Sequence, residues 1–154
     1  MVDEPSDLPR VIGMNHVALE VGDIAAALDW YRQLFSFELR SQSDSSAFID
    51  MGDQFIALFE GGPGTVDKGR HLGLVVEDLA AAQRRIESAN IEQLDTSGVD
   101  ILDPWGNRLQ LVAYEEIQFT KATHVLEGMG LRHLSKSDGA VEELAAKGLA
   151  PEDG

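Results

Sequence analysis

The sequence predicts an α+β fold in which two paired βαβββ modules form a curved mixed sheet around a central trough, followed by a helical extension. A twelve-residue segment occurs twice, 55 positions apart, as HVALEVGDIAAA at residues 16–27 and HLGLVVEDLAAA at residues 71–82, with seven positions identical. Each copy changes from the alternating apolar pattern of a strand to helical spacing after an aspartate. The repeat and this change of period together indicate a duplicated module.

Each module is predicted to begin with a strand and a capped helix. Residues 11–21 alternate as a strand, and Asp23 is placed to cap the helix that follows. The second module repeats this order with a strand over residues 70–77 and with Asp78 as the cap. The helices have inner apolar stripes formed by Ile24, Leu28, Tyr31 and Phe35 in the first and by Leu79, Ala82, Ile86 and Ala89 in the second.

Three further strands are expected in each module. They are predicted over residues 38–43, 47–51 and 54–60 in the first module, and over residues 91–94, 99–102 and 108–113 in the second. Gly, Pro, Asp and Asn residues mark turns after residue 60 and at residues 103–107. The two modules therefore span residues 11–62 and 69–114 of a single domain, residues 11–114. Residues 1–10 are expected to form a flexible tail, and residues 115–154 a helical C-terminal extension.

Composition limits the classes of function. The 154 residues include 27 acidic and 12 basic side chains, a net charge of −15, which disfavours nucleic acid as a partner. The chain has no cysteine, so thiol catalysis and disulfides are excluded. No signal peptide or membrane-spanning run is recognisable, and we expect a cytoplasmic protein with no membrane partner. The acidic excess fits either a solvated surface or a cleft that attracts a cation.

Strand alternation predicts which side chains face the trough. In the first strands of the modules, His16 and His71 lie opposite the apolar residues that face the helices. Aligning the last strands, FIALFEG at 55–61 and RLQLVAY at 108–114, matches Ala57 with Gln110. Four symmetry-related positions therefore face the trough.

The same alternation gives the trough apolar walls. The predicted substrate pocket consists of Phe55, Ala57, Phe59, Val75 and Val112. A mostly apolar pocket with a few polar groups suits a small organic ligand. The alternative is that these side chains fill a dimer interface.

The duplicated opening H-x-x-L-x-V-x-D and the closing DPWGNRLQLV resemble the vicinal oxygen chelate superfamily, which includes glyoxalase I, fosfomycin-resistance enzymes, extradiol dioxygenases and bleomycin-resistance proteins. The resemblance covers residues 11–114. It implies a divalent metal, such as zinc, nickel, iron or manganese, held by His16, His71 and Gln110. The sequence departs from the family pattern in two places, because Gln110 replaces the usual glutamate and Ala57 leaves the fourth ligand position empty.

The resemblance leads to two alternative functions. The first is a metal-dependent, glyoxalase-like lyase or isomerase that acts on a small oxygenated substrate, with no catalytic base assigned because both family carboxylates are missing. The alternative is a non-catalytic, metal-free protein of the bleomycin-resistance type that sequesters a cationic ligand at a dimer trough. A dioxygenase is disfavoured because Gln110 removes the carboxylate of the two-His-one-carboxylate site. A homodimer is expected, and the modules pair either within the chain or between subunits.

Overall fold

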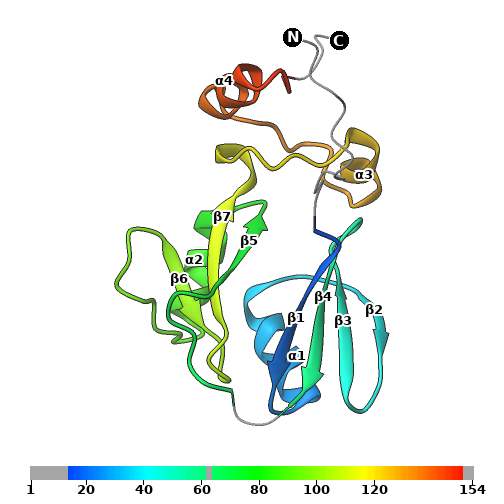
Figure 1. Ribbon diagram of the computed structural model, residues 1–154, viewed down its shortest axis with the longest axis vertical. Helices are drawn as coiled ribbons and strands as arrows, with labels where there is room; N and C mark the ends of the chain where they lie inside the picture. The colour runs from blue at the N-terminus through cyan, green and yellow to red at the C-terminus, as the bar shows by residue number, and fades with distance from the viewer. Residues whose placement is uncertain (1–13, 62–63, 151–154) are drawn as a thin grey trace, which may run out of the picture.

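The computed structural model describes residues 14–61 and 64–150 and confirms the α+β class, with two modules that each pack a helix against a sheet (Figure 1). The predicted tail of residues 1–10 lies outside the described residues. In the part of the chain that the structure describes, every helix is too short or too polar to cross a membrane.

The first module forms a four-stranded sheet with the order β1-β4-β3-β2. Its elements are β1 (His16–Val21), α1 (Ile24–Leu34), β2 (Leu39–Gln42), β3 (Ser46–Asp50) and β4 (Phe55–Glu60). Strands β1 and β4 are parallel, with His16 opposite Phe55, whereas β3 runs antiparallel to both of its neighbours. All four predicted strands of this module are present, but the strand predicted over residues 11–21 begins only at His16, and residues 11–13 lie outside the described residues.

The second module forms a three-stranded sheet with the order β5-β7-β6. Its elements are β5 (Leu72–Val76), α2 (Leu79–Ser88), β6 (Val99–Leu102) and β7 (Arg108–Ala113). The strand predicted over residues 91–94 is wrong, because this segment forms only an isolated bridge between Gln93 and Ile101. The chain turns away immediately after Leu94, where the Thr96 amide donates to the Leu94 carbonyl. The pairing with β6 therefore does not extend beyond this single bridge.

The predicted helix caps are confirmed. Asp23 accepts a hydrogen bond from the Ala26 amide at 2.7 Å, and Asp78 accepts one from the Ala81 amide at 2.9 Å. Each carboxylate satisfies an amide that the first helical turn leaves without a partner. The two copies of the repeat therefore use the same residue for the same local purpose.

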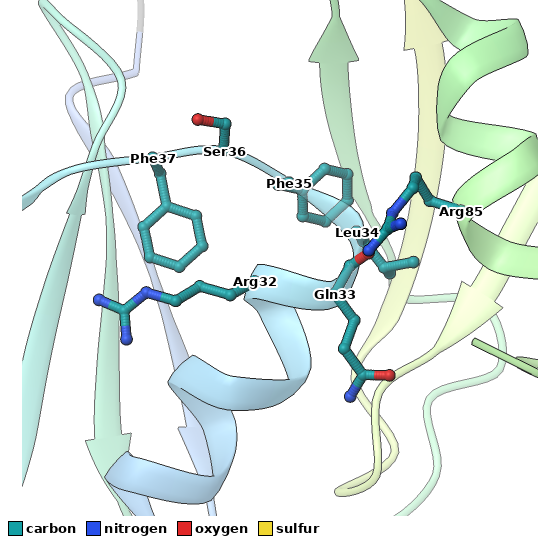
Figure 2. A pocket seen from close by; sticks show the side chains of 7 residues that line it. All are labelled: Arg32, Gln33, Leu34, Phe35, Ser36, Phe37 and Arg85. Carbon is teal, nitrogen blue, oxygen red and sulfur yellow. The ribbon is translucent and has the colours of Figure 1, made fainter. Parts of the chain in front are cut away.

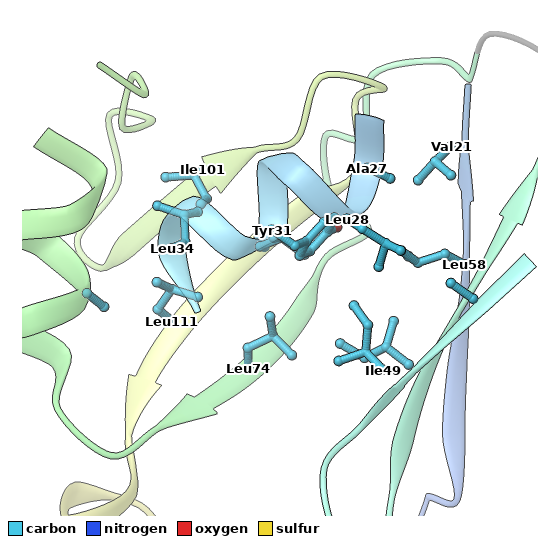
Figure 3. Close-up of a cluster of buried hydrophobic side chains, with 14 of the residues drawn as sticks. Val21, Ala27, Leu28, Tyr31, Leu34, Ile49, Leu58, Leu74, Ile101 and Leu111 are labelled. Carbon is cyan, nitrogen blue, oxygen red and sulfur yellow. The ribbon is translucent and has the colours of Figure 1, made fainter. Parts of the chain in front are cut away.

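One hydrophobic core joins both modules. It contains the helix-facing residues of both sheets together with α1 and α2. Figure 3 shows Leu34 of α1 beside Ile101 and Leu111 of the second sheet, while Leu28 points toward Leu58 of the first sheet. Because α1 packs on both sheets, burial of its side chains stabilises both modules at once.

Hydrogen bonds also connect the two modules. The Tyr31 hydroxyl donates to Asp103 at 3.0 Å, and the Asn107 amide donates to the Glu20 carbonyl at 2.8 Å. Burial, with the Asp103 charge beside it, raises the pKa of Tyr31 well above its ordinary value. Trp105 packs so closely on Gly22 that a Cβ there would lie 2.4 Å from the indole nitrogen. The 103–107 turn of the second module thus binds the first module.

The C-terminal region contains three short helices, η1 (Tyr114–Glu116), α3 (Thr123–Gly128) and α4 (Asp138–Ala146). Among residues 115–150, these helices cover only part of the extension that the sequence predicts to be helical. Lys136 attaches this region to the end of β7, because its ammonium donates to the carbonyls of Tyr114, Ile117 and Phe119. The same ammonium lies 3.6 Å from the centroid of the Tyr114 ring.

Candidate functional site

The face of the first sheet opposite α1, here called its outer face, carries His16 and three phenylalanines. His16 stacks on Phe55 with ring centroids 4.7 Å apart and 13° between the ring planes. Phe48 lies near both Phe55 and Phe59, at centroid distances of 5.3 and 6.1 Å. Ala57 is paired with Phe48 across the strands and is buried. The outer face of the first sheet is therefore aromatic and begins at His16.

Arg40 covers part of this aromatic surface. Its guanidinium carbon lies 4.6 Å from the centroid of the Phe55 ring, a cation–π distance. Nε donates to Asp50 at 2.7 Å, and Nη2 donates to the carbonyls of Gly52 and Gln54 at 2.8 and 3.2 Å. These bonds hold the guanidinium in one orientation and pair its charge with a carboxylate.

The outer face of the second sheet, opposite α2, carries His71 and Gln110. His71 directly precedes β5, and Gln110 of β7 lies between Gly73 and Asp100 in the strand register. A Cβ placed on Gly98 would be 3.2 Å from Gln110 Nε2 and 3.4 Å from Asp100 Oδ2, so the ends of these two side chains meet at this loop. Polar groups therefore predominate where the first sheet has aromatic rings.

Asp100 is a buried carboxylate, with 1% of its surface exposed. Arg108 donates to Oδ1 from Nε at 3.1 Å and from Nη2 at 3.0 Å, and the Thr96 hydroxyl donates to Oδ2 at 2.7 Å. Burial alone would raise the pKa of Asp100, but the hydrogen bonds from Thr96 and Arg108, with the nearby Arg108 and His71, outweigh it and lower this pKa. Asp100 thus keeps a negative charge beside Gln110.

The two histidines are held in the same way. Nδ1 of His16 is 2.8 Å from the Asn15 side-chain oxygen, and Nδ1 of His71 is 3.0 Å from the Gly69 carbonyl. Because both partners are acceptors, Nδ1 carries the proton in each neutral ring and Nε2 has a free lone pair. Metal-binding histidines in proteins are usually oriented by such a bond from the second nitrogen. The donor chemistry of both rings therefore fits a metal ligand.

Within one chain the two histidines belong to different sheets. Among residues 14–61 and 64–150, no group of three or more His, Cys, Asp or Glu side chains is arranged to hold a metal ion. Strand β1, which begins at His16, belongs to the first sheet, whereas β5, which follows His71, belongs to the second sheet and runs in the opposite direction in Figure 1.

The predicted pocket residues are divided in the same way between the two sheets. Phe55, Ala57 and Phe59 lie on β4, whereas Val75 and Val112 lie opposite each other on β5 and β7. Phe59 is 43% exposed and Val75 is 37% exposed. The structure thus places these residues on two separate outer faces.

Two open surface pockets lie away from both outer faces. One, of about 470 Å³, follows the end of α1 and is bordered by Arg32, Phe37 and Arg85 (Figure 2). The other, of about 460 Å³, lies at the start of α2 and is bordered by Glu77 and His133. Neither contains a residue predicted for the site.

Sequence reasoning missed three residues of the outer faces: Arg40, Phe48 and Asp100. Asp100 had a recognisable signal, because a charged residue between Val99 and Ile101 of a core strand must point away from the core. Phe48 follows from the same alternation between Ala47 and Ile49. Arg40 had no such signal, since a register shift between Leu39 and Ser41 interrupts the alternation at that point.

The chain is similar in sequence and in structure to known proteins. A 48-residue segment is 31% identical to the metallothiol transferase FosB of Staphylococcus haemolyticus, covering 31% of this chain and 34% of FosB, so the match spans about a third of that relative. The fosfomycin resistance protein FosX of Listeria monocytogenes, solved with Mn(II) and sulfate, has a TM-score of 0.59 at 17% identity, over 78% of this chain and 99% of FosX.

A mutant of the same FosX, solved with Mn(II) and 1S,2S-dihydroxypropylphosphonic acid, has a TM-score of 0.58 at 18% identity, over 68% of this chain and 93% of that chain. Likeness at these identities establishes a common fold. The family match is broader, because residues 13–111 fit the family described as the Glyoxalase/Bleomycin resistance protein/Dioxygenase superfamily. The chain therefore belongs to the glyoxalase/bleomycin resistance protein/dioxygenase superfamily.

Proposed function

We propose that this chain is a metal-dependent lyase or isomerase of glyoxalase type, acting on a small oxygenated molecule in a trough formed between two copies of the chain. The observation that carries the proposal is the matching state of His16 and His71. Each ring is oriented through Nδ1 by an oxygen acceptor, which leaves Nε2 available as a ligand.

We place the site between two copies because, within one chain, His16 belongs to the first sheet and His71 and Gln110 belong to the second. In a twofold dimer, the first sheet of each copy faces the second sheet of the other, which creates two equivalent troughs. Such pairing also covers Phe59 and Val75, which are large exposed apolar side chains in the single chain. The homodimer expected from the sequence therefore becomes part of the site.

Each trough would hold one divalent ion through His16 of one copy and His71 and Gln110 of the other. Two imidazoles suit zinc, nickel, iron or manganese better than magnesium or calcium. The presence of Mn(II) in FosX, which shares the fold, supports this choice of group. Gln110 brings no charge, and the carboxylate beside it, Asp100, is already paired with Arg108.

A bound divalent ion would polarise two adjacent substrate oxygens and stabilise negative charge that develops on them. The chain's own residues define the space around these oxygens. Phe48, Phe55 and Phe59 form an apolar wall that restricts water, and Arg40 holds Phe55 in place against His16. Arg108 and Thr96 hold Asp100 beside Gln110.

Metal content of purified protein, loaded in turn with zinc, nickel, iron and manganese, tests the proposal. We expect about one ion per chain, with the loss of binding in His16→Ala and in His71→Ala. His124→Ala removes an exposed histidine of α3 and is the matched control that keeps the metal. Gln110→Glu should raise the metal affinity about tenfold, since a carboxylate replaces a neutral amide.

Mixing His16→Ala with His71→Ala after reversible dissociation tests whether each site spans two copies. A heterodimer then contains one trough with both histidines, and random mixing restores about a quarter of the wild-type metal content. No recovery on mixing, while each variant remains dimeric, would contradict a site shared between copies.

A metal-free wild type that ignores all four ions would overturn the enzyme proposal. The aromatic outer face and the net charge of −15 would then favour the second candidate, a bleomycin-resistance-type protein that binds a cationic ligand without metal. Calorimetric titration with bleomycin would test that candidate directly.

A further inference from the structure

The arginines of α1 and α2 differ from the other arginines in their partners. Among the residues that the structure describes, four arginines form an ion pair with a carboxylate, namely Arg40, Arg70, Arg108 and Arg132. Arg32 of α1 and Arg84 and Arg85 of α2 form none. Because acidic side chains outnumber basic ones by 27 to 12, a shortage of carboxylates does not account for this difference.

Two of these arginines line a surface pocket. The pocket at the end of α1, of about 470 Å³, is lined by Arg32, Arg85 and neutral residues, and no acidic side chain is among its described lining residues. The pocket at the start of α2 has nearly the same volume but is lined by Glu77, Asp78 and Glu115. Sites for small molecules have volumes of about 300–1,000 Å³. The two pockets are thus of suitable size and opposite charge, and the positive one suits an anion.

Arg85 connects the two modules at this pocket. Its Nε donates to the Gln33 carbonyl at 2.9 Å, so a side chain of α2 occupies a carbonyl at the C-terminal end of α1. In the described part of the chain this is the hydrogen bond that Arg85 makes, and Nη1 and Nη2 remain available. A guanidinium held in one orientation can donate to a carboxylate from two nitrogens at once.

Arg32 contributes the second cation of the pocket. Its guanidinium carbon lies 5.3 Å from the centroid of the Phe37 ring. Figure 2 shows Arg32 with Phe37 on one side of the pocket and Arg85 with Leu34 and Phe35 on the other. Both phenylalanines are partly exposed. The pocket therefore has a cation on each side and apolar surface next to each cation.

Three acidic residues lie near these arginines in the sequence. Asp29 precedes Arg32 by one helical turn, and Glu87 follows Arg85 by two residues. Glu38 comes directly after the lining segment. None of the three lines the pocket or forms an ion pair with either arginine among the described residues. Their charges lower the affinity for an anion without occupying its place, and salt screens both effects.

We propose that this pocket binds a small organic dianion with an apolar body, with one anionic group on Arg32 and the other on Arg85. Arg32 belongs to the first module and Arg85 to the second, so the ligand bridges the modules. The inference is independent of the proposed function, because the pocket contains no residue of the trough.

Four probes separate charge from apolar contact. Terephthalate, benzoate and terephthalamide have the same ring with two, one and no charges, and sulfate is a dianion without an apolar body. Each is titrated into the full-length protein at low salt, as purified and after removal of metal, with NMR shifts and calorimetry as readouts. We expect terephthalate to bind about tenfold tighter than benzoate or sulfate, and terephthalamide to bind weakest.

Variants connect this preference to the two arginines. In Arg32→Gln and in Arg85→Gln one carboxylate loses its cation, so the tenfold preference for terephthalate over benzoate should fall to about twofold or less. Arg84→Gln makes the same change of charge at a neighbouring position of α2 outside the lining and is the matched control that keeps the preference. All three arginines are exposed, which makes the variants compatible with folding.

The outcomes separate this inference from the proposed function. Terephthalate that binds no tighter than benzoate or sulfate would overturn a site with two cations. An equal loss of the preference in Arg84→Gln would mean a general attraction of anions to α2 and would overturn the assigned pocket. Loss of terephthalate binding in His16→Ala or His71→Ala would place the dianion in the trough and overturn this inference alone. Failure to bind any metal, with the terephthalate preference retained, would overturn the proposed function alone.

Discussion

The inner, helix-facing sides of the two modules are alike, whereas their outer faces differ. Both begin with the repeated segment, both cap their helix with aspartate, and both bury the helix-facing residues in one core. Their outer faces differ, since the first has stacked rings around Phe55 whereas the second has a buried ion pair between Asp100 and Arg108. The first sheet also has four strands, and the second has three.

This difference indicates where a duplicated module is free to change. The inner residues of each module contact the other module through α1, so a substitution there affects the packing of both. The outer residues do not belong to that shared core. The outer faces have therefore diverged into an aromatic and an ionic surface while the core kept its pattern.

The largest expected effect tests the shared core. Leu58→Ala in the first sheet and Leu111→Ala in the second each remove a buried side chain, and each should lower the free energy of unfolding by about 2–5 kcal/mol. Urea unfolding followed by circular dichroism and by the fluorescence of Trp30 and Trp105 measures this loss. Both variants should show one coincident transition. Two separate transitions would mean that the modules unfold independently and would break the comparison.

The next effect compares the ion pairs of the two outer faces. Arg108→Met leaves the buried Asp100 charge without its partner and should cost about 3 kcal/mol of stability. Arg40→Met breaks a pair whose side chains are each 36% exposed, and should cost less than about 1 kcal/mol. Thermal and urea unfolding of the two variants, side by side, give the two values. Equal losses of stability in the two variants would show that the ion pairs of the two outer faces are equally exposed to water.

The smallest effect compares the two helix caps. Asp23→Ala and Asp78→Ala each remove an acceptor from the first helical turn, and each should cost about 1 kcal/mol of stability. Asp29→Ala, an exposed position within α1, is the control and should be close to neutral. A loss of stability in only one of the two variants would show that both modules keep the aspartate but that it stabilises the helix in only one of them.

The sequence was a good guide wherever local pattern and structure depend on the same few residues. Helix α1 follows from its Asp23 cap and its apolar stripe, and β6 and β7 have the predicted bounds. The sequence-based prediction was wrong at residues 91–94. Their pattern predicts a strand, but the chain turns after Leu94 and only one bridge forms. The alternation around Asp100 indicates that its side chain faces away from the core, but its ion pair with Arg108 could not be predicted, because it depends on the pairing of β6 with β7.

The sequence by itself determined the duplicated module, its caps, the residues that face the core, and the placement of His16, His71 and Gln110 on the opposite side of their strands. These properties follow from alternation and helical spacing, which are local. Only the tertiary structure decided that α1 packs on both sheets and that β1 and β5 belong to separate sheets, so that His16 and His71 lie on different outer faces. Such relations depend on how distant surfaces pack together, and no local pattern encodes the direction in which one sheet meets another.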